Sequence, residues 1–207
     1  LSGLGGGWAG GGVVGARGGG PRVAGSLPPI FGSYEPDLFQ PDRVQDYLGV
    51  LVEELAPFVD VFLGETLSLI VEAAAVERAV ADTGKPFWIS FTLRDEPGAE
   101  ALPPALRSGE SVADAARCLA GSNASALLFN CSRPEVMRQA VKVAATPRAE
   151  TGRPVAIGVY ANAFPSEDNG AANETLHAIR DDLSAERYAA FACDWVDSGA
   201  TMVGGCC

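Results

Sequence analysis

The chain has 207 residues, which is enough for one sizeable hydrophobic core and too short for two ordinary domains. Its net charge of −11 argues against a nucleic-acid partner and against docking on an anionic membrane, because both require a basic surface. No apolar run approaches the roughly 18 residues of a membrane span, and no signal-peptide pattern is present. We therefore expect a soluble, cytoplasmic protein.

Glycine dominates residues 1–22, as in Gly5-Gly6-Gly7 and Gly10-Gly11-Gly12. A dinucleotide-binding glycine turn would need a strand before it and an amphipathic helix after it, and neither pattern is present. We expect residues 1–22 to be a flexible, low-complexity lead-in, and residues 23–207 to form the folded domain. Because the chain begins with Leu1 rather than Met, we also expect a fragment or a processed chain.

Short apolar runs then alternate with longer segments of helical pattern. The runs begin near Val23, Val59, Phe87, Ala126, Val155 and Thr201. Their starts lie 28 to 46 residues apart, which is the repeat length of a strand–helix unit. Because the runs are apolar almost throughout, they predict parallel strands buried on both faces. The pattern leaves two architectures open, a doubly wound open sheet and a closed (β/α)₈ barrel.

Helical periodicity fills the segments between these runs. Residues 42–58 place Val44, Tyr47, Leu48, Leu51 and Leu55 on one face, and residues 67–80 show a similar stripe that begins at Leu67.

The sequence also predicts both ends of the last helix and the burial of two cysteines. We expect Ser184 to cap a helix that runs through Trp195, and Gly199 to end it. Cys118 and Cys193 fall within helical patterns, and we expect both thiols to be buried in the core.

Polar or metal-binding side chains follow the carboxyl ends of successive apolar runs. They are Glu65, Thr66, Ser90, Thr92, Asn130, Cys131, Tyr160, Asn162, Cys206 and Cys207. Because the carboxyl ends of parallel strands in a barrel meet at one mouth, this arrangement predicts a functional site there.

Three of these residues, Cys131, Cys206 and Cys207, carry thiols, which are favoured ligands of zinc. The one histidine, His177, lies in a polar stretch away from every predicted strand end. A histidine-based zinc site or a Ser-His-Asp triad is therefore almost excluded. On spacing alone, the adjacent cysteines could equally be small buried residues of a final strand, or form a disulfide with Cys131.

The other polar positions have structural interpretations as well. Glu65 could be a charge at a helix N-terminus, where the helix dipole favours it. Ser90 and Thr92 could be ordinary strand residues. Asn130, Tyr160 and Asn162 could satisfy backbone groups in turns.

Taken in order, these segments resemble the homocysteine S-methyltransferase family. The similar segments are residues 23–29, 64–66, 90–93, 130–131, 160–162, 197–200 and 204–207. The resemblance implies a (β/α)₈ TIM barrel in which the six runs are barrel strands three to eight. Strands one and two would then be missing, so residues 23–207 would be a partial homocysteine-binding barrel, truncated at both ends. An unclosed barrel of this kind should be poorly stable or prone to aggregate.

The resemblance also implies a chemistry. Zinc would be bound by Cys131, Cys206 and Cys207, with homocysteine supplying the fourth sulfur. A methyl group would pass from a sulfonium donor such as S-methylmethionine to the homocysteine thiolate, giving methionine, and Glu65 would pair with the substrate ammonium. The remaining expected substrate-binding or supporting residues are Ser90, Thr92, Asn130, Tyr160 and Asn162.

Three alternatives stay open at this point. Betaine could be the methyl donor, with Phe31, Tyr34 and Trp88 as candidate aromatic faces for its cation. The chain could be a non-catalytic fragment that at most binds zinc. It could also be a zinc-free scaffold barrel, in which case all its cysteines should react freely with a thiol probe.

Overall fold

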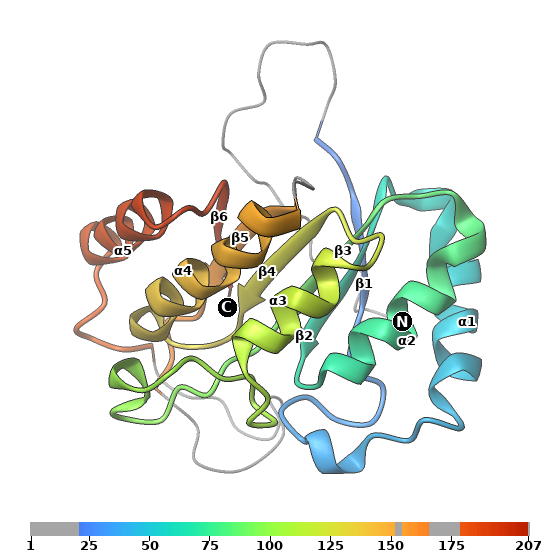
Figure 1. Cartoon of the computed structure of the whole chain (residues 1–207), viewed down its shortest axis with the longest axis horizontal. Helices are drawn as coiled ribbons and strands as arrows, with labels where there is room; N and C mark the ends of the chain where they lie inside the picture. Colours follow the sequence, from blue (N-terminus) through green and yellow to red (C-terminus); the bar gives the residue numbers. More distant parts are fainter. Residues whose placement is uncertain (1–20, 152–154, 166–178, 207) are drawn as a thin grey trace.

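The computed structural model describes residues 21–151, 155–165 and 179–206 (Figure 1). One parallel sheet runs through this part of the chain, with helices between its strands. The strands are β1 (Ala24–Leu27), β2 (Val61–Leu67), β3 (Phe87–Phe91), β4 (Ala126–Asn130), β5 (Ala156–Ala161) and β6 (Met202–Gly205). The α-helices are α1 (Val44–Leu55), α2 (Ile70–Val80), α3 (Val112–Ala120), α4 (Pro134–Thr151) and α5 (Ala185–Asp197). Short 3₁₀ turns η1 (Pro36–Leu38), η2 (Ala56–Phe58), η3 (Ala81–Thr83) and η4 (Ala99–Ala101) complete the set.

The order of the strands decides between the two architectures that the sequence left open. The sheet runs β1-β2-β3-β4-β5-β6, and each strand pairs in parallel with the next one along the chain. A doubly wound sheet would reverse direction at a switch point, and no reversal occurs among the described strands. The fold is α/β with a sequential parallel sheet, which fits an incomplete (β/α)₈ barrel. The six predicted strand positions are confirmed.

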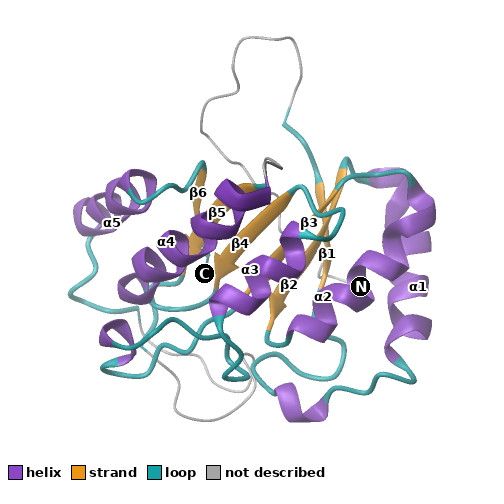
Figure 2. Cartoon of the chain, viewed as in Figure 1, coloured by secondary structure: helices purple, strands orange, loops and turns teal. Residues whose placement is uncertain are grey.

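The two faces of the sheet have different partners, and helices cover one of them (Figure 2). On that face, strand residues such as Phe62, Ile89 and Phe129 form one core with Val76 of α2 and Met137 of α4. Alternate residues of the same strands point the other way, as the pleat requires. The second face is built from strands and from Cys206, which follows β6, and its buried members are Leu63, Ala126, Leu128 and Tyr160.

The prediction that the strands are buried on both faces is confirmed for the middle of the sheet and is wrong for its two edge strands. Every residue of β4 is buried. In β1 and β6, which each have one strand neighbour, exposed residues alternate with covered ones.

The sheet curls around its second face. The hydroxyl of Tyr160 on β5 lies 3.1 Å from a carboxylate oxygen of Glu65 on β2. In a flat sheet those strands, three intervals apart, would be separated by about 14 Å. The amide of Asn130 on β4 likewise reaches Thr66 on β2 at 2.8 Å, passing over β3. The second face is therefore concave, and its polar residues converge at the carboxyl ends of the strands.

The boundary between β2 and α2 corrects one prediction. Leu67, expected to begin a helical stripe, is instead the last residue of β2 and is buried there. The helix starts at Ile70, because the Glu72 carboxylate accepts hydrogen bonds from the backbone N–H groups of Ser68 and Leu69 at 2.7 and 2.9 Å. Only two residues separate strand from helix, so the apolar pattern of one runs into the other.

Of the predictions for the buried face of α1 and the ends of α5, one is wrong and the others are confirmed. In α1, Val44, Leu48 and Val52 are buried, whereas Tyr47, expected on the buried face, is 43% exposed. In α5 the Ser184 side chain accepts a hydrogen bond from the N–H of Arg187, so the predicted cap is confirmed. Gly199 follows the helix with φ of 116°, which suits glycine and confirms the predicted end.

The predicted burial of Cys118 and Cys193 is wrong, since both thiols are exposed. The buried face of α3 follows positions 112, 115, 116 and 119, and Cys118 falls outside this stripe. In α5 the fully buried residue is Trp195, and a residue two positions earlier points to the opposite side of the helix. Among the described residues, no helix is both long enough and apolar enough to cross a bilayer.

Candidate functional site

The structure brings two of the three predicted zinc ligands into contact. Cys131 is the first residue after β4, and Cys206 is the first residue after β6. Their Sγ atoms lie 2.9 Å apart, although 75 residues separate them in the chain. The backbone N–H of Cys206 donates to the carbonyl of Ala161 on β5, which holds the end of β6 in register. Cys207, the third predicted ligand, lies outside the described residues, as does His177.

The sulfur pair can be compared with what a metal ion would require. Two thiolates bound to one tetrahedral zinc at about 2.3 Å would have sulfur atoms about 3.8 Å apart. The observed 2.9 Å is shorter, so the side chains would have to open by a little under 1 Å to admit an ion. No group of three His, Cys, Asp or Glu residues able to hold a metal occurs within the described ranges. Both donors are nevertheless soft thiols in one place, which is the chemistry that zinc prefers.

Backbone strain marks the same position. Three non-glycine residues of the described part have positive φ: Tyr34 at 69°, Thr66 at 63° and Cys131 at 50°. Two of them contact the third: the Tyr34 hydroxyl donates to the Cys131 carbonyl at 3.3 Å, and the Thr66 hydroxyl lies 3.8 Å from the Cys131 sulfur. Each such conformation costs about 1–3 kcal/mol and persists where the surroundings enforce it, typically at functional sites.

Glu65 lies near the carboxyl end of β2, and each of its carboxylate oxygens accepts a hydrogen bond from a hydroxyl group. The Ser26 hydroxyl of β1 donates to Oε2 at 2.6 Å, and the Tyr160 hydroxyl of β5 donates to Oε1 at 3.1 Å. Burial raises the pKa of Tyr160, and the Glu65 carboxylate raises it further, so the phenol keeps its proton and remains a donor. Glu65 itself is half-buried, and each of its oxygens retains capacity to accept from a ligand.

A second polar chain crosses the concave face beside the thiols. The Ser90 hydroxyl of β3 donates to Oδ1 of Asn130 at 2.7 Å, and Nδ2 of Asn130 donates to the Thr66 hydroxyl at 2.8 Å. Ser90 and Asn130 are fully buried. Their side chains therefore fix Thr66, which in turn touches Cys131.

Thr92 and Asn162 contact the chain segment that contains Cys131 and Ser132. The Thr92 hydroxyl lies 3.4 Å from the Cys131 carbonyl and 3.1 Å from the Ser132 hydroxyl. The backbone N–H of Asn162 donates to the Ser132 carbonyl at 3.2 Å, while its side chain accepts from the N–H of Phe164 in a local turn. Of the predicted site residues, Glu65, Ser90, Asn130, Cys131, Tyr160 and Cys206 converge, whereas Thr92 lies behind the Cys131 backbone and the Asn162 side chain is turned to its own loop.

Sequence reasoning missed three residues of this network. Ser26 lies in a segment that was singled out, yet its hydroxyl carried no signal of its own. Ser132 binds the backbone of Leu93 with its hydroxyl, at 2.8 Å from the N–H, and is fully buried. Tyr34 was considered as an aromatic face, but its hydroxyl is what reaches Cys131. Burial raises the pKa of Tyr34, and the neighbouring Cys131 thiol raises it further, so this phenol also stays protonated.

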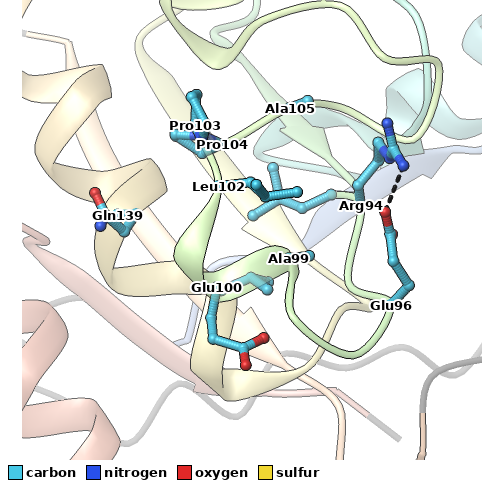
Figure 3. A pocket seen from close by; sticks show the side chains of 11 residues that line it. Arg94, Glu96, Ala99, Glu100, Leu102, Pro103, Pro104, Ala105 and Gln139 are labelled. Carbon is cyan, nitrogen blue, oxygen red and sulfur yellow. Dashed lines mark hydrogen bonds and ion pairs between the residues drawn. The ribbon is translucent and has the colours of Figure 1, made fainter.

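A separate cavity of about 40 Å³ lies between η4 and α4 (Figure 3). Leu93, Leu102, Pro104, Val136 and Gln139 are among its lining residues, and an ion pair between Arg94 and Glu96 lies at its side. This volume suits a few water molecules rather than an amino acid. The thiols and Glu65 do not line it, so it is separate from the candidate site.

The curled parallel sheet with strands in sequential order places this chain among α/β barrel-like proteins, and thiols and a carboxylate lie at the carboxyl ends of its strands. The sequence model of one family, described as homocysteine S-methyltransferase, matches residues 11–207. The chain belongs to this family. The match begins at residue 11, within the glycine-rich segment.

Solved structures of low identity share the fold. The chain is similar to the carboxyl transferase domain (Y628A) of pyruvate carboxylase from Rhizobium etli, solved with pyruvate, at a TM-score of 0.53 and 14% identity. That match covers 88% of this chain and 27% of the other. The same domain with pyruvate and biocytin gives 0.52 and 15%, over 87% of this chain and 26% of the other. The chain thus spans about a quarter of these proteins. No curated protein sequence matches it significantly.

Proposed function

We propose that this chain catalyses zinc-dependent transfer of a methyl group from a sulfonium donor, such as S-methylmethionine, to homocysteine, giving methionine. Zinc would be held by Cys131, Cys206 and Cys207. The observation that carries the proposal is the contact of the Cys131 and Cys206 sulfur atoms, 2.9 Å apart at the carboxyl ends of β4 and β6, in a member of this family. A bound zinc ion would supply a substrate thiol that is deprotonated at neutral pH.

The residues around the thiols fit an amino acid thiol as substrate. Glu65, held by Ser26 and Tyr160, would accept hydrogen bonds from the homocysteine ammonium. The chain of Ser90, Asn130 and Thr66 would fix the surroundings of the Cys131 sulfur. Displacement of a methyl group from a sulfonium needs no acid or base at carbon, so the absence of a catalytic histidine among these residues is no obstacle.

We propose a sulfonium donor rather than betaine, and one aromatic face considered for betaine is already occupied within the protein. A quaternary ammonium is bound by open aromatic faces. The Phe31 ring packs edge-on against Phe39 and Tyr47, with centroids 6.5 and 5.9 Å apart. The face of Tyr34 carries the Arg107 guanidinium at 4.7 Å. The face of Tyr34 is thus engaged within the protein, and a betaine site would have to be built without it.

The remaining parts of the proposal concern the domain and its location. Residues 23–207 would form the homocysteine-binding domain, with β1 to β6 as barrel strands three to eight. Thiolate ligands are preserved in a reducing compartment, so we place the reaction in the cytoplasm.

Zinc content and activity test the proposal together. We expect about one zinc per chain in the wild type, loss of that zinc in Cys206→Ser, and retention in Cys193→Ser, whose thiol is exposed on α5. With homocysteine as acceptor, we expect methionine from S-methylmethionine and little from betaine. A folded wild type without zinc, or a Cys206→Ser variant that keeps it, would refute the site. Zinc binding without transfer from either donor would favour the non-catalytic alternative.

A further inference from the structure

Two hydroxyl groups hold the backbone of Cys131 in its left-handed conformation, and one of them, that of Tyr34, also lies beside the Cys131 thiol. The Cys131 carbonyl lies within hydrogen-bonding distance of the Tyr34 hydroxyl at 3.3 Å and of the Thr92 hydroxyl at 3.4 Å. With φ of 50°, Cys131 would relax toward the common regions of backbone space if these contacts were lost. Such a relaxation would swing its side chain away from Cys206.

Tyr34 reaches this carbonyl from the loop after β1, 97 residues earlier in the chain. A charged side chain also holds the Tyr34 ring in place. The guanidinium of Arg107 stacks on it, 4.7 Å from the ring centroid, in a cation–π contact. Only 16% of the Arg107 side chain is exposed, so the contact is shielded from water.

Arg107 is in turn fixed by a buried carboxylate. Its Nη1 lies 3.0 Å from Oδ1 of Asp95, which is 2% exposed. The other oxygen of Asp95 accepts from the backbone N–H of Arg133 at 3.0 Å, and the Arg133 side chain donates to the Asp95 carbonyl at 2.5 Å. Arg133 is two residues after Cys131. The contacts thus form a closed path from Tyr34 through Arg107 and Asp95 back to the Cys131 segment.

We propose that Tyr34 is a positioning residue for the Cys131 ligand, and that Arg107, anchored by Asp95, holds the Tyr34 ring so that its hydroxyl bonds the Cys131 carbonyl and the thiol faces Cys206. This inference rests on the proposed function, since it concerns a metal ligand. It assigns to Tyr34 a role in metal affinity and ligand geometry, not contact with substrate.

The test compares two tyrosines that differ in what their hydroxyl does. Tyr34→Phe keeps the ring and the Arg107 stacking and removes only the hydroxyl. The matched control is Tyr47→Phe, because Tyr47 is also stacked by an arginine, Arg43 at 5.3 Å, and its hydroxyl bonds that same arginine rather than the Cys131 backbone. Zinc affinity is measured by competition with a chromogenic chelator. The cobalt(II)-substituted proteins are compared by their thiolate-to-metal absorption bands.

We expect the zinc dissociation constant of Tyr34→Phe to rise about 10–100-fold, with altered cobalt bands, as is typical when a group supporting a metal ligand is removed. Tyr47→Phe should match the wild type in both readouts. Arg107→Lys, which keeps the charge for Asp95 but loses the planar stack, should weaken zinc binding in the same direction and by less.

Two different failures can be told apart. If the wild type binds zinc and Tyr34→Phe binds it equally, with unchanged cobalt bands, the role of Tyr34 is refuted and the proposed function stands. If the wild type binds no zinc, the proposed function fails and this inference fails with it. An Arg107→Lys protein identical to the wild type would refute the part assigned to Arg107.

Discussion

The hydroxyl of Tyr160 on β5 and the carboxylate of Glu65 on β2 meet at 3.1 Å across the concave face of the sheet. Their contact exists because the sheet curls, and it places a carboxylate with an attached proton donor beside the Cys131 and Cys206 thiols. Substrate recognition in the proposed reaction depends on this pair.

Tyr160→Phe should therefore affect substrate binding more than metal binding. A hydrogen bond to a charged group contributes about 1.5–3 kcal/mol, so we expect the KM for homocysteine to rise roughly tenfold to hundredfold. Zinc content should not change. Ser26→Ala, which removes the donor on the other oxygen of Glu65, should raise KM in the same way. A lower melting temperature with unchanged KM in both variants would show that the pair is purely structural.

The cysteines should fall into two classes toward a thiol reagent. In the zinc-loaded protein we expect the exposed Cys118 and Cys193 to react, and Cys131 and Cys206 to react only after a chelator is added. Cys118 should be the slower of the exposed pair, because partial desolvation against its helix and the nearby Glu77 raise the pKa of its thiol. Equal and immediate reaction of all the cysteines would support the zinc-free scaffold alternative.

Glycine 158 on β5 should tolerate no larger side chain. A Cβ at Gly158 would lie 2.9 Å from a methyl carbon of Leu128 and 3.2 Å from Cβ of Met202, within the floor of the concave face. We expect Gly158→Ala to destabilise the protein by about 1–3 kcal/mol, measured by denaturant unfolding. Gly49→Ala is the control, because Gly49 lies inside α1 with nothing within 4 Å of its added Cβ. That change should stabilise by about 0.5–1 kcal/mol. Equal effects of the two substitutions would mean that the floor is not packed as described.

The ion pair of Arg180 and Glu135 should contribute stability that depends on pH. Burial alone would raise the pKa of Glu135, but hydrogen bonds from Arg180, at 2.7 Å and 3.0 Å, more than offset this and hold that pKa below its ordinary value. The contribution is therefore present above about pH 4.3, the unfolded value, and is lost as the pH falls through the lower folded value.

Glu135→Gln should consequently lose stability at neutral pH and show a shallower fall in melting temperature between about pH 6 and about pH 3. Glu96→Gln serves as the control, because the Glu96 pair with Arg94 is more exposed and should contribute little. A parallel acid profile for Glu135→Gln and the wild type would contradict this account.

The sequence predicted where the strands lie and which polar residues end them, because both depend on local pattern. Apolar runs of strand length are recognisable without knowledge of their neighbours, and Cys131 and Cys206 each follow such a run directly. Their convergence followed from one rule of parallel sheets. The contact of the two sulfur atoms was in this sense foreseeable from residue type and position.

The features that could not be predicted depend on the path of loops and on contacts between segments that are distant in the sequence. Tyr34 lies in an irregular loop, and neither its positive φ nor its contact with Cys131 leaves a trace in the sequence. The pairing of Arg107 with Asp95 joins two segments without regular structure. The prediction that Cys118 is buried was wrong because the sequence pattern does not distinguish a small apolar residue beside a buried stripe from one within it.

The sequential order of the strands has a consequence for how the protein forms. Each strand docks beside one that has already been synthesised, so the sheet can grow from β1 onward as the chain emerges. The contacts at the mouth join far more distant positions, 97 residues apart for Tyr34 and Cys131, 95 for Glu65 and Tyr160, and 75 for Cys131 and Cys206. Closing such long loops is entropically costly until the intervening strands are in place. The two thiols therefore meet only after β6 has docked, later than the contact of Glu65 with Tyr160, which needs β5 alone.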